Sequence, residues 1–575
     1  MWNPGRPELF GCLLAAVPAT SRAMAVVSAL LVALSLSMAG PAAGGSGAAG
    51  AAELVRVVPN PVAAEDQGES VTLSVPPGTV LGRFALTDGE DRVRLPNRTV
   101  GGRVTLTAAP QAVENRSRGP PRGALIRAAL PALANSGDEL RLLLNGVVVD
   151  SLSYRDAPES EGYRPAVGEF RPLGATSFPV QTTDGGPATA FVLPDAPEPP
   201  VAAVRDADER VLLAGYTLAS ERVTDALVAA ARRGARVRVL VDGAPVGGLS
   251  RAQADSLDRL VAAEVAVGVV GGPRARYDFH HAKYVVADDR AVVLTENWKP
   301  AGVGGNSSRG WGVTVRDNET AAALARIFRA DFRGRGARPW SVARPTYESF
   351  EPSEPANGSY PTRFRPNEVP VDRVGVLVAP DNAEQAVVSH IDAADESVRV
   401  LQATAGSPDQ PFVRALVRAA RRGIRVRVLL NGAWYAREQN RAVVRALNER
   451  AAREGLDLSA KLADPRGRFG KVHAKGLIVD GESVLLGSLN WNNHSARENR
   501  EVVFTLRSEG AAHYFRRVFR ADWRGGAWRL PVGLLGSTLV AAGAALWLAS
   551  GFEFESRDRE TENAGVAADD DRVGW

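Results

Sequence analysis

Hydrophobic and polar positions alternate along several short stretches between residues 53 and 155, as expected for strands that bury one face. Asn145-Gly146 separates the last two stretches and is typical of a tight hairpin turn. Short alternating runs bounded by turn residues favour a β-sandwich, and we expect no catalytic group within it. The stretches are 54–58, 71–75, 104–106, 140–144 and 147–149.

After residue 200 the apolar positions follow a helical period, and the whole pattern occurs twice. Residues 227–243 and 416–432 differ at only four positions. Each copy predicts an amphipathic helix ended by glycine, followed by a strand rich in Val and Leu. With a strand before each helix, the pattern predicts an α/β fold made of two duplicated α/β/α domains. We place these domains at 197–345 and 365–528, with proline-rich linkers before and between them.

The two halves also share a polar motif with the spacing H-x-K-x(4)-D. It consists of His281, Lys283 and Asp288 in the first half, and of His473, Lys475 and Asp480 in the second. In extended backbone the His and Lys of each motif point to the same face. A neutral imidazole can attack phosphorus or pass a proton, while an ammonium group holds phosphate oxygens. Lysine is scarce beside arginine in this chain, which makes its presence in both motifs informative.

This duplicated motif resembles that of the phospholipase D superfamily, in which two copies build one active site. The resemblance implies cleavage or transfer of phosphodiesters through a phosphohistidine, with no metal or other cofactor. It implies that His281 is the nucleophile, that His473 is the general acid, and that Lys283 and Lys475 bind the phosphate. Asp288 and Asp480 are expected to orient the motif. The supporting, substrate-binding positions that it implies are Asn297, Ser488, Asn490 and Glu501.

The first copy departs from the pattern. Where the second half has Gly487-Ser488-Leu489-Asn490, the first has Leu294-Thr295-Glu296-Asn297 and is one residue shorter. Glu296 is predicted to bring negative charge to the phosphate position, and Gly310 stands at the rough counterpart of Glu501. The first half is therefore expected to be partly eroded around His281 and Lys283.

The N-terminal strands resemble the lamin-tail immunoglobulin-like domain. The resemblance is carried by the opening Val58-Pro59-Asn60-Pro61 and by the closing segments 137–140 and 150–154. It implies a binding or spacer domain at 53–155 beside the catalytic halves.

Both ends of the chain predict segments outside these domains. Residues 1–52 combine an apolar stretch at 23–38 with small residues, as in a signal peptide and linker. Residues 530–549 are apolar and uncharged, which predicts a transmembrane helix before an acidic tail at 550–575. We therefore expect a single-pass protein of the cell membrane with its catalytic domains outside the cell.

Three functions fit these patterns. The first is a membrane-anchored phosphodiesterase that acts on phospholipids. Because one chain carries both motifs, we expect the protein to be a monomer. The second is a metal-independent nuclease, in which Trp298, Trp311 and Trp491 would stack on bases. The net charge of +4 is too small to favour nucleic acid by itself. The third is an inactive surface binding protein, suggested by Glu296.

Overall fold

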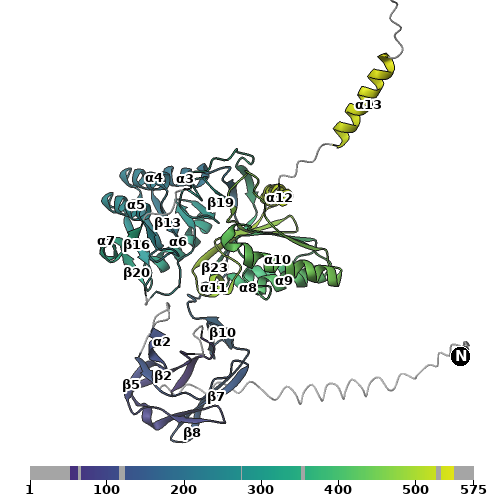
Figure 1. The fold of residues 1–575 in the computed structure, drawn as a ribbon. Helices are drawn as coiled ribbons and strands as arrows, with labels where there is room; N and C mark the ends of the chain where they lie inside the picture. Colours follow the sequence, from purple (N-terminus) through teal and green to yellow (C-terminus); the bar gives the residue numbers. More distant parts are fainter. Residues whose placement is uncertain are drawn as a thin grey trace, which may run out of the picture.

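The computed structural model describes residues 52–61, 67–114, 124–272, 275–350, 356–525 and 532–549. The predicted signal peptide, apart from Ala52, and the predicted acidic tail lie outside these residues. An N-terminal β-domain precedes two α/β halves that lie side by side (Figure 1).

Two sheets form the N-terminal domain and enclose one hydrophobic core. Asn145 and Gly146 adopt left-handed φ angles of 52° and 92°, so the hairpin predicted there is confirmed. The six-stranded sheet has the order β10 (Glu169–Pro172), β9 (Glu161–Arg164), β1 (Glu53–Val58), β2 (Ser70–Val80), β5 (Thr99–Thr107) and β6 (Ala124–Arg127). The four-stranded sheet has the order β4 (Arg92–Arg94), β3 (Phe84–Thr87), β7 (Gly137–Leu144) and β8 (Val147–Arg155).

The segment 156–196, predicted to be a linker, contains four strands. Strands β9 and β10 complete the N-terminal sheet, while β11 (Gln181–Thr183) and β12 (Gly186–Leu193) join the sheets of the two α/β halves. The prediction of a linker was wrong because the Pro and Gly residues mark turns between short strands.

Each α/β half is built on one large mixed sheet. The first runs β20 (Ala337–Pro339), β16 (Ala266–Val270), β14 (Arg236–Asp242), β13 (Arg210–Gly215), β17 (Tyr284–Ala287), β18 (Arg290–Leu294), β19 (Ser308–Arg316), β12 and β22 (Asn367–Val371). The second runs β11, β23 (Arg373–Ala379), β30 (Glu501–Arg507), β29 (Ser483–Gly487), β28 (Lys475–Val479), β24 (Ser397–Gln402), β25 (Arg425–Leu430) and β26 (Leu458–Leu462). The predicted β-α-β units are confirmed, since β13 pairs in parallel with β14, and β24 with β25.

Helices cover the outer face of each sheet, and one helix of each half lies at the inner face. The outer helices of the first half are α3 (Glu198–Arg205), α4 (Glu221–Arg232) and α5 (Arg251–Ala262), with α7 (Trp340–Ala343) beside β16. Those of the second half are α8 (Ala383–Asp392), α9 (Pro411–Arg421) and α10 (Trp434–Glu454). The inner helices are α6 (Asn318–Phe332) and α12 (Glu509–Arg524), and α11 (Asn493–Arg497) precedes β30.

The inner helices begin at equivalent capping residues. Asp317 caps α6 by accepting a hydrogen bond from the Thr320 amide, and Ser508 caps α12 by accepting one from the Ala511 amide. Such caps satisfy amide groups that would otherwise lack a partner in the first turn. The duplication therefore extends to the ends of individual helices.

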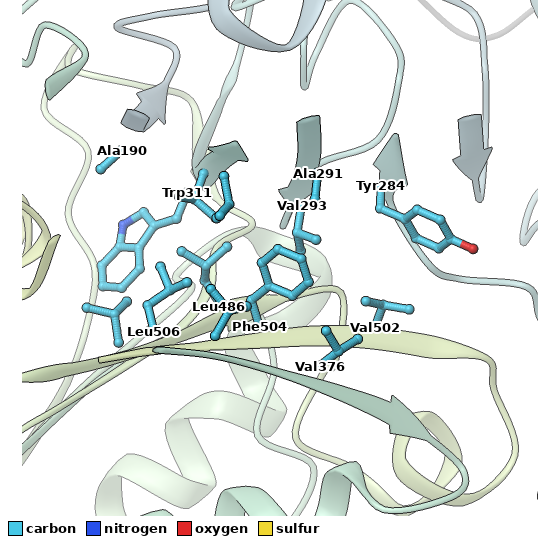
Figure 2. Packing of buried hydrophobic residues seen from close by; sticks show 14 of the residues in the cluster. Ala190, Tyr284, Ala291, Val293, Trp311, Val376, Leu486, Val502, Phe504 and Leu506 are labelled. Carbon is cyan, nitrogen blue, oxygen red and sulfur yellow. The ribbon is translucent and has the colours of Figure 1, made fainter. Parts of the chain in front are cut away.

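The two halves share one hydrophobic core, which joins the inner faces of both sheets (Figure 2). Trp311 of β19 packs there against Phe515 of α12, with ring centroids 4.5 Å apart. The halves also exchange edge strands, because β11 pairs with β23 of the second half and β22 with β12 of the first. The two domains are therefore placed rigidly enough to share a site.

The apolar segment predicted to span a membrane contains the helix α13 (Val532–Ala549). Among the described residues, however, no helix combines the length and apolar character needed to cross a bilayer. The prediction of a transmembrane helix at 530–549 is corrected accordingly.

Candidate active site

The two motif histidines lie where the halves meet, and each is held by the backbone of the opposite half. The His281 amide donates to the Arg500 carbonyl oxygen at 2.9 Å. The His473 amide donates to the Arg309 carbonyl oxygen at 3.0 Å, where the short strand β27 (Lys471–Val472) pairs with β19. The structure thus brings together two motifs whose histidines, 281 and 473, are 192 residues apart in the chain.

Glu501 of the second half holds the ring of His281. Both of its carboxylate oxygens lie 2.9 Å from Nδ1 of His281, and the Glu501 side chain is fully buried. A carboxylate only accepts hydrogen bonds, so Nδ1 carries the proton and Nε2 keeps its lone pair. This arrangement suits a nucleophile.

Glu296 of the first half plays the equivalent part for His473. Its Oε2 lies 3.2 Å from Nδ1 of His473, and its side chain is also buried. The prediction that Glu296 places an unwanted charge at the phosphate position was therefore wrong, because its carboxylate points to the imidazole.

The position of Gly310 explains how Glu296 reaches His473. Gly310 follows Arg309 as Glu501 follows Arg500, so a carboxylate on residue 310 would match Glu501. A Cβ atom built on Gly310 would lie only 2.2 Å from Cγ of Glu296. The side chain of Glu296 therefore occupies the space that a residue at position 310 would need.

The residue missing from the first copy falls in a turn. The β17–β18 hairpin pairs Ala287 with Arg290, whereas the β28–β29 hairpin pairs Val479 with Ser483, which leaves one more residue in the second turn. The deletion is thus at the end of the strands away from the histidines. The prediction that the first half is eroded was therefore wrong, both for Glu296 and for the missing residue.

The carboxyl groups of Glu296 and Glu501 differ in pKa. Burial raises the pKa of Glu296 to about 7, although nearby lysines, first Lys475, oppose this shift. Burial also disfavours ionised Glu501, but His281 and Lys283 outweigh it and lower the pKa of that carboxyl. Near neutral pH the site therefore pairs one histidine with a carboxylate and the other with a carboxyl group that can hold a proton.

Both imidazoles are neutral near neutral pH. Burial lowers the pKa of His281 to about 4 against the opposing effect of Glu501. Burial and then Lys475 lower the pKa of His473 well below its usual value. A neutral His281 is able to attack phosphorus.

The motif lysines are buried beside their histidines. Lys283 donates to the carbonyl oxygen of His281, and Lys475 donates to that of His473 at 2.8 Å. Lys475 also lies 3.5 Å from the carbonyl oxygen of Thr295 in the opposite half. Burial lowers the pKa of both amines, that of Lys475 to about 8, so a phosphate would restore favourable surroundings for their charge.

Asp288 and Asp480 do not join the histidines. Asp288 accepts hydrogen bonds from the amides of residues 208–210, and Asp480 from those of residues 395–397. Each begins a turn with a left-handed φ angle, 54° and 53° respectively. These contacts fit the prediction that both aspartates orient the motif. Neither aspartate takes part in proton transfer to or from the histidines.

The remaining predicted residues surround the motifs. Ser488 accepts a hydrogen bond from the Val502 amide at 3.0 Å, as Thr295 does from the Trp311 amide at 2.9 Å. Asn297 and Asn490 stand two residues later in each copy, and the side-chain oxygen of each is buried and lacks a partner among the described residues. The substrate-binding role of these two residues stays a prediction.

Sequence reasoning missed a pair of buried arginines. Arg500 forms ion pairs of 3.0 Å with Asp331 of the opposite half and with Asp381 of its own. Arg309 pairs likewise with Asp522 at 2.9 Å and Asp195 at 2.5 Å. The repeated segments 326–332 and 517–523 contained the signal, because each carries one of these aspartates at the same place.

Arg500→Ala is expected to destabilise the protein by roughly 3–5 kcal/mol, because two buried carboxylates lose their partner. The free energy of unfolding in urea measures this. The matched control is Arg418→Ala, which removes a half-exposed ion pair with Asp392 and is expected to cost at most about 1 kcal/mol. Equal effects of the two substitutions would contradict a structural part for Arg500.

The three tryptophans near the motifs are core residues. Trp298 and Trp311 are fully buried, and Trp491 is 3% exposed and stacks on Phe412. None of these rings is open to a base, so the stacking predicted for a nuclease is corrected.

One group of described residues could hold a metal ion. Ligand atoms of Asp278, His494 and Glu498 lie within 4.8 Å of one another. The group includes neither motif histidine, and no step of the chemistry below uses it.

Comparison with known proteins agrees with this geometry. The family model described as "Cardiolipin synthase, PLD-like domain" matches residues 201–332 and 387–523. The chain contains two phospholipase D-like domains. The match includes both motifs and both carboxylates. It leaves out the N-terminal β-domain, for which the lamin-tail resemblance stays a prediction.

Several proteins are similar to the two phospholipase D-like domains. Cardiolipin synthase A of Yersinia pseudotuberculosis is 24% identical over 50% of this chain and 58% of its own length. Cardiolipin synthase C of Escherichia coli K12 is 28% identical over 21% of this chain and 29% of its own length. The chain thus spans less than two thirds of either relative. The crystal structure of phosphatidylserine synthase from Haemophilus influenzae Rd KW20 superposes with a TM-score of 0.44 and 14% identity, covering 64% of this chain and 94% of that one.

Proposed function

We propose that the protein is a phospholipase D-type enzyme that transfers the phosphatidyl group of a phospholipid to an acceptor alcohol. The observation that carries the proposal is the pair of histidine–carboxylate contacts that cross the domain interface, each with a buried lysine beside it. The names of the similar synthases support a phospholipid as the substrate.

In the first step, Nε2 of His281 attacks phosphorus while the bond to the leaving alkoxide breaks. Lys283 and Lys475 neutralise the phosphate oxygens. His473 gives its Nε2 proton to the leaving oxygen and receives on Nδ1 the proton held by Glu296, 3.2 Å away. The products are a phosphohistidine and a neutral alcohol.

In the second step, an acceptor alcohol attacks phosphorus and gives its proton to Nε2 of His473. The proton on Nδ1 of His473 then returns to Glu296. The nitrogen–phosphorus bond breaks and His281 is regenerated. If water is the acceptor, the same steps give hydrolysis. The location outside the cell stays a prediction, since the predicted signal peptide lies outside the described residues apart from Ala52.

The experiment that tests this function offers the full chain anionic phospholipid vesicles and single-stranded DNA in EDTA. We expect an exchanged or hydrolysed head group, no DNA cleavage, and loss of lipid turnover in His473→Ala. DNA cleavage without lipid turnover would make the protein a nuclease. Strict dependence on added metal would contradict the phosphohistidine mechanism.

A further inference from the structure

The two motif lysines take different positions beside their histidines, although the motifs are otherwise equivalent. Nζ of Lys475 lies 3.3 Å from each ring nitrogen of His473. In the part of the chain that the structure describes, Lys283 makes no hydrogen bond to the ring of His281. Its ammonium group lies instead 5.3 Å from the ring centroid of Tyr216. No ammonium group of its own motif therefore competes for the lone pair on Nε2 of His281.

Tyr216 follows directly on β13, and the strand register places it beside the first motif. β13 pairs with β17, and Ala214 lies opposite Tyr284, which is the residue after Lys283. Tyr216 stands two residues after Ala214, at the end of the strand where the motif lies.

The equivalent place in the second half is occupied by Ala403. β24 pairs with β28 in the same register, because Leu401 lies opposite Gly476, the residue after Lys475. Ala403 stands two residues after Leu401, and it is 5% exposed. A methyl group offers no aromatic face to a cation, so the two lysines have different surroundings.

The ring of Tyr216 is held on several sides. Its hydroxyl oxygen accepts a hydrogen bond from the Val246 amide. The ring of Phe279 meets it edge-on, with centroids 5.7 Å apart. The ring of His281 lies at 4.7 Å with an interplanar angle of 66°. Tyr216 is only 9% exposed, so its ring face is fixed relative to His281.

The ring face competes with His281 for the ammonium group of Lys283. Attraction of a desolvated ammonium group to an aromatic face corresponds to a factor of about ten or more in an equilibrium constant. Burial lowers the pKa of Lys283, whereas Glu501 and the ring face favour its charged form. Without the ring, Lys283 would be free to donate to Nε2 of His281, and a lone pair engaged in this way attacks phosphorus less readily.

The second half has the opposite requirement. Lys475 lies within hydrogen-bond distance of the His473 ring, and a cation there favours release of a proton from the imidazole. That placement suits a general acid, as the placement of Lys283 suits a nucleophile.

We infer that Tyr216 is a positioning residue that holds Lys283 over its ring face and so leaves Nε2 of His281 free to attack phosphorus. With Ala403 at the equivalent place, it breaks the symmetry of the duplicated site and assigns the nucleophile to the first motif. The inference rests on the proposed function for the reaction itself. The contact that it describes exists in the resting protein and is measurable without turnover.

Nitrogen NMR of the full-length protein, labelled on histidine, tests the contact without substrate. The chain has six histidines, and comparison with His281→Ala assigns the signal of Nε2 of His281. We expect this signal to move upfield in Tyr216→Leu, where Lys283 donates to the nitrogen, and to stay in place in Tyr216→Phe, which keeps the ring. Tyr435→Leu is the matched control, because the ring of Tyr435 also faces a lysine, Lys471 at 5.2 Å, that belongs to neither motif.

The first turnover of a p-nitrophenyl phosphodiester by full-length His473→Ala measures the attack on phosphorus. Adding Tyr216→Leu should lower the rate of this burst about tenfold and leave its amplitude near one equivalent. Adding Tyr216→Phe or Tyr435→Leu should change the rate by less than about threefold. Thermal unfolding verifies that each variant is folded, and Tyr216→Met carries the same expectation if the leucine variant does not fold.

An unchanged signal of His281 in Tyr216→Leu would overturn the inference, even if the burst rate falls, since packing alone would then explain the loss. An equal fall in Tyr216→Phe would assign the effect to the hydroxyl group and overturn the part given to the ring. A wild-type chain that turns over no phosphodiester, while the signal moves as expected, would contradict the proposed function and uphold the placement of Lys283.

Discussion

His281→Ala is expected to reduce turnover of every phosphodiester by about 10⁴-fold or more, because no other group can form the covalent intermediate. His473→Ala is expected to reduce turnover of phospholipids by roughly 10²–10⁴-fold, the usual contribution of a general acid. Steady-state rates with phospholipid and with a p-nitrophenyl phosphodiester measure both effects.

The second substrate separates the two roles. p-Nitrophenolate leaves without protonation, so His473→Ala should still release it in a rapid first burst of about one equivalent per enzyme, and then turn over slowly. His281→Ala should show no burst. A burst in His281→Ala and none in His473→Ala would mean that the roles are reversed.

Glu296→Gln is expected to lower phospholipid turnover by roughly 10²–10⁴-fold, because glutamine can contact His473 but cannot supply its proton. The wild-type rate should rise with pH as His281 loses its proton near its pKa of about 4, and should fall above about 7 as Glu296 loses its own. The rate of the Glu296→Gln variant should not show this fall above about pH 7. The pH dependence of kcat measures the change.

A second substitution provides the control for Glu296. Gly310→Glu combined with Glu296→Leu gives the first half the arrangement of the second, in which Leu489 precedes Asn490 and Glu501 follows the buried arginine. Because this moves the carboxyl group to the symmetric position, activity should recover in part relative to Glu296→Leu alone. Failure of both Glu296→Gln and Glu296→Leu to reduce turnover would contradict the proton-donor role.

The sequence sufficed for the parts of the fold that depend on local pattern. Periodicity and turn residues predicted the β-domain, its Asn145-Gly146 hairpin and the repeated β-α-β units, and the identical spacing of His281 and His473 predicted two equivalent motifs. The linker at 156–196 was misjudged because its strands are short and pair with partners far along the chain. A helix lies at Val532–Ala549 within the predicted segment, but among the described residues no helix is long and apolar enough to cross a membrane.

The contacts that define the site could not be read from one chain. Glu296 reaches His473, and Glu501 reaches His281, only after the two halves pack together. In the linear alignment Glu296 stands opposite Leu489, which led to the prediction of an unwanted charge at the phosphate position. In space its side chain takes the place of one at Gly310. The buried Arg309 and Arg500 likewise form ion pairs with aspartates of the opposite half, which the sequence alone does not show.

The most direct measurement of the central claim is to trap the covalent intermediate and locate it. Full-length His473→Ala would be mixed with a p-nitrophenyl phosphodiester, quenched under alkaline conditions that preserve phosphohistidine, and analysed by peptide mass spectrometry. We predict one adduct per chain, on His281. An adduct on any other residue, or none during a measured burst, would contradict a single site built by both halves with His281 as its nucleophile.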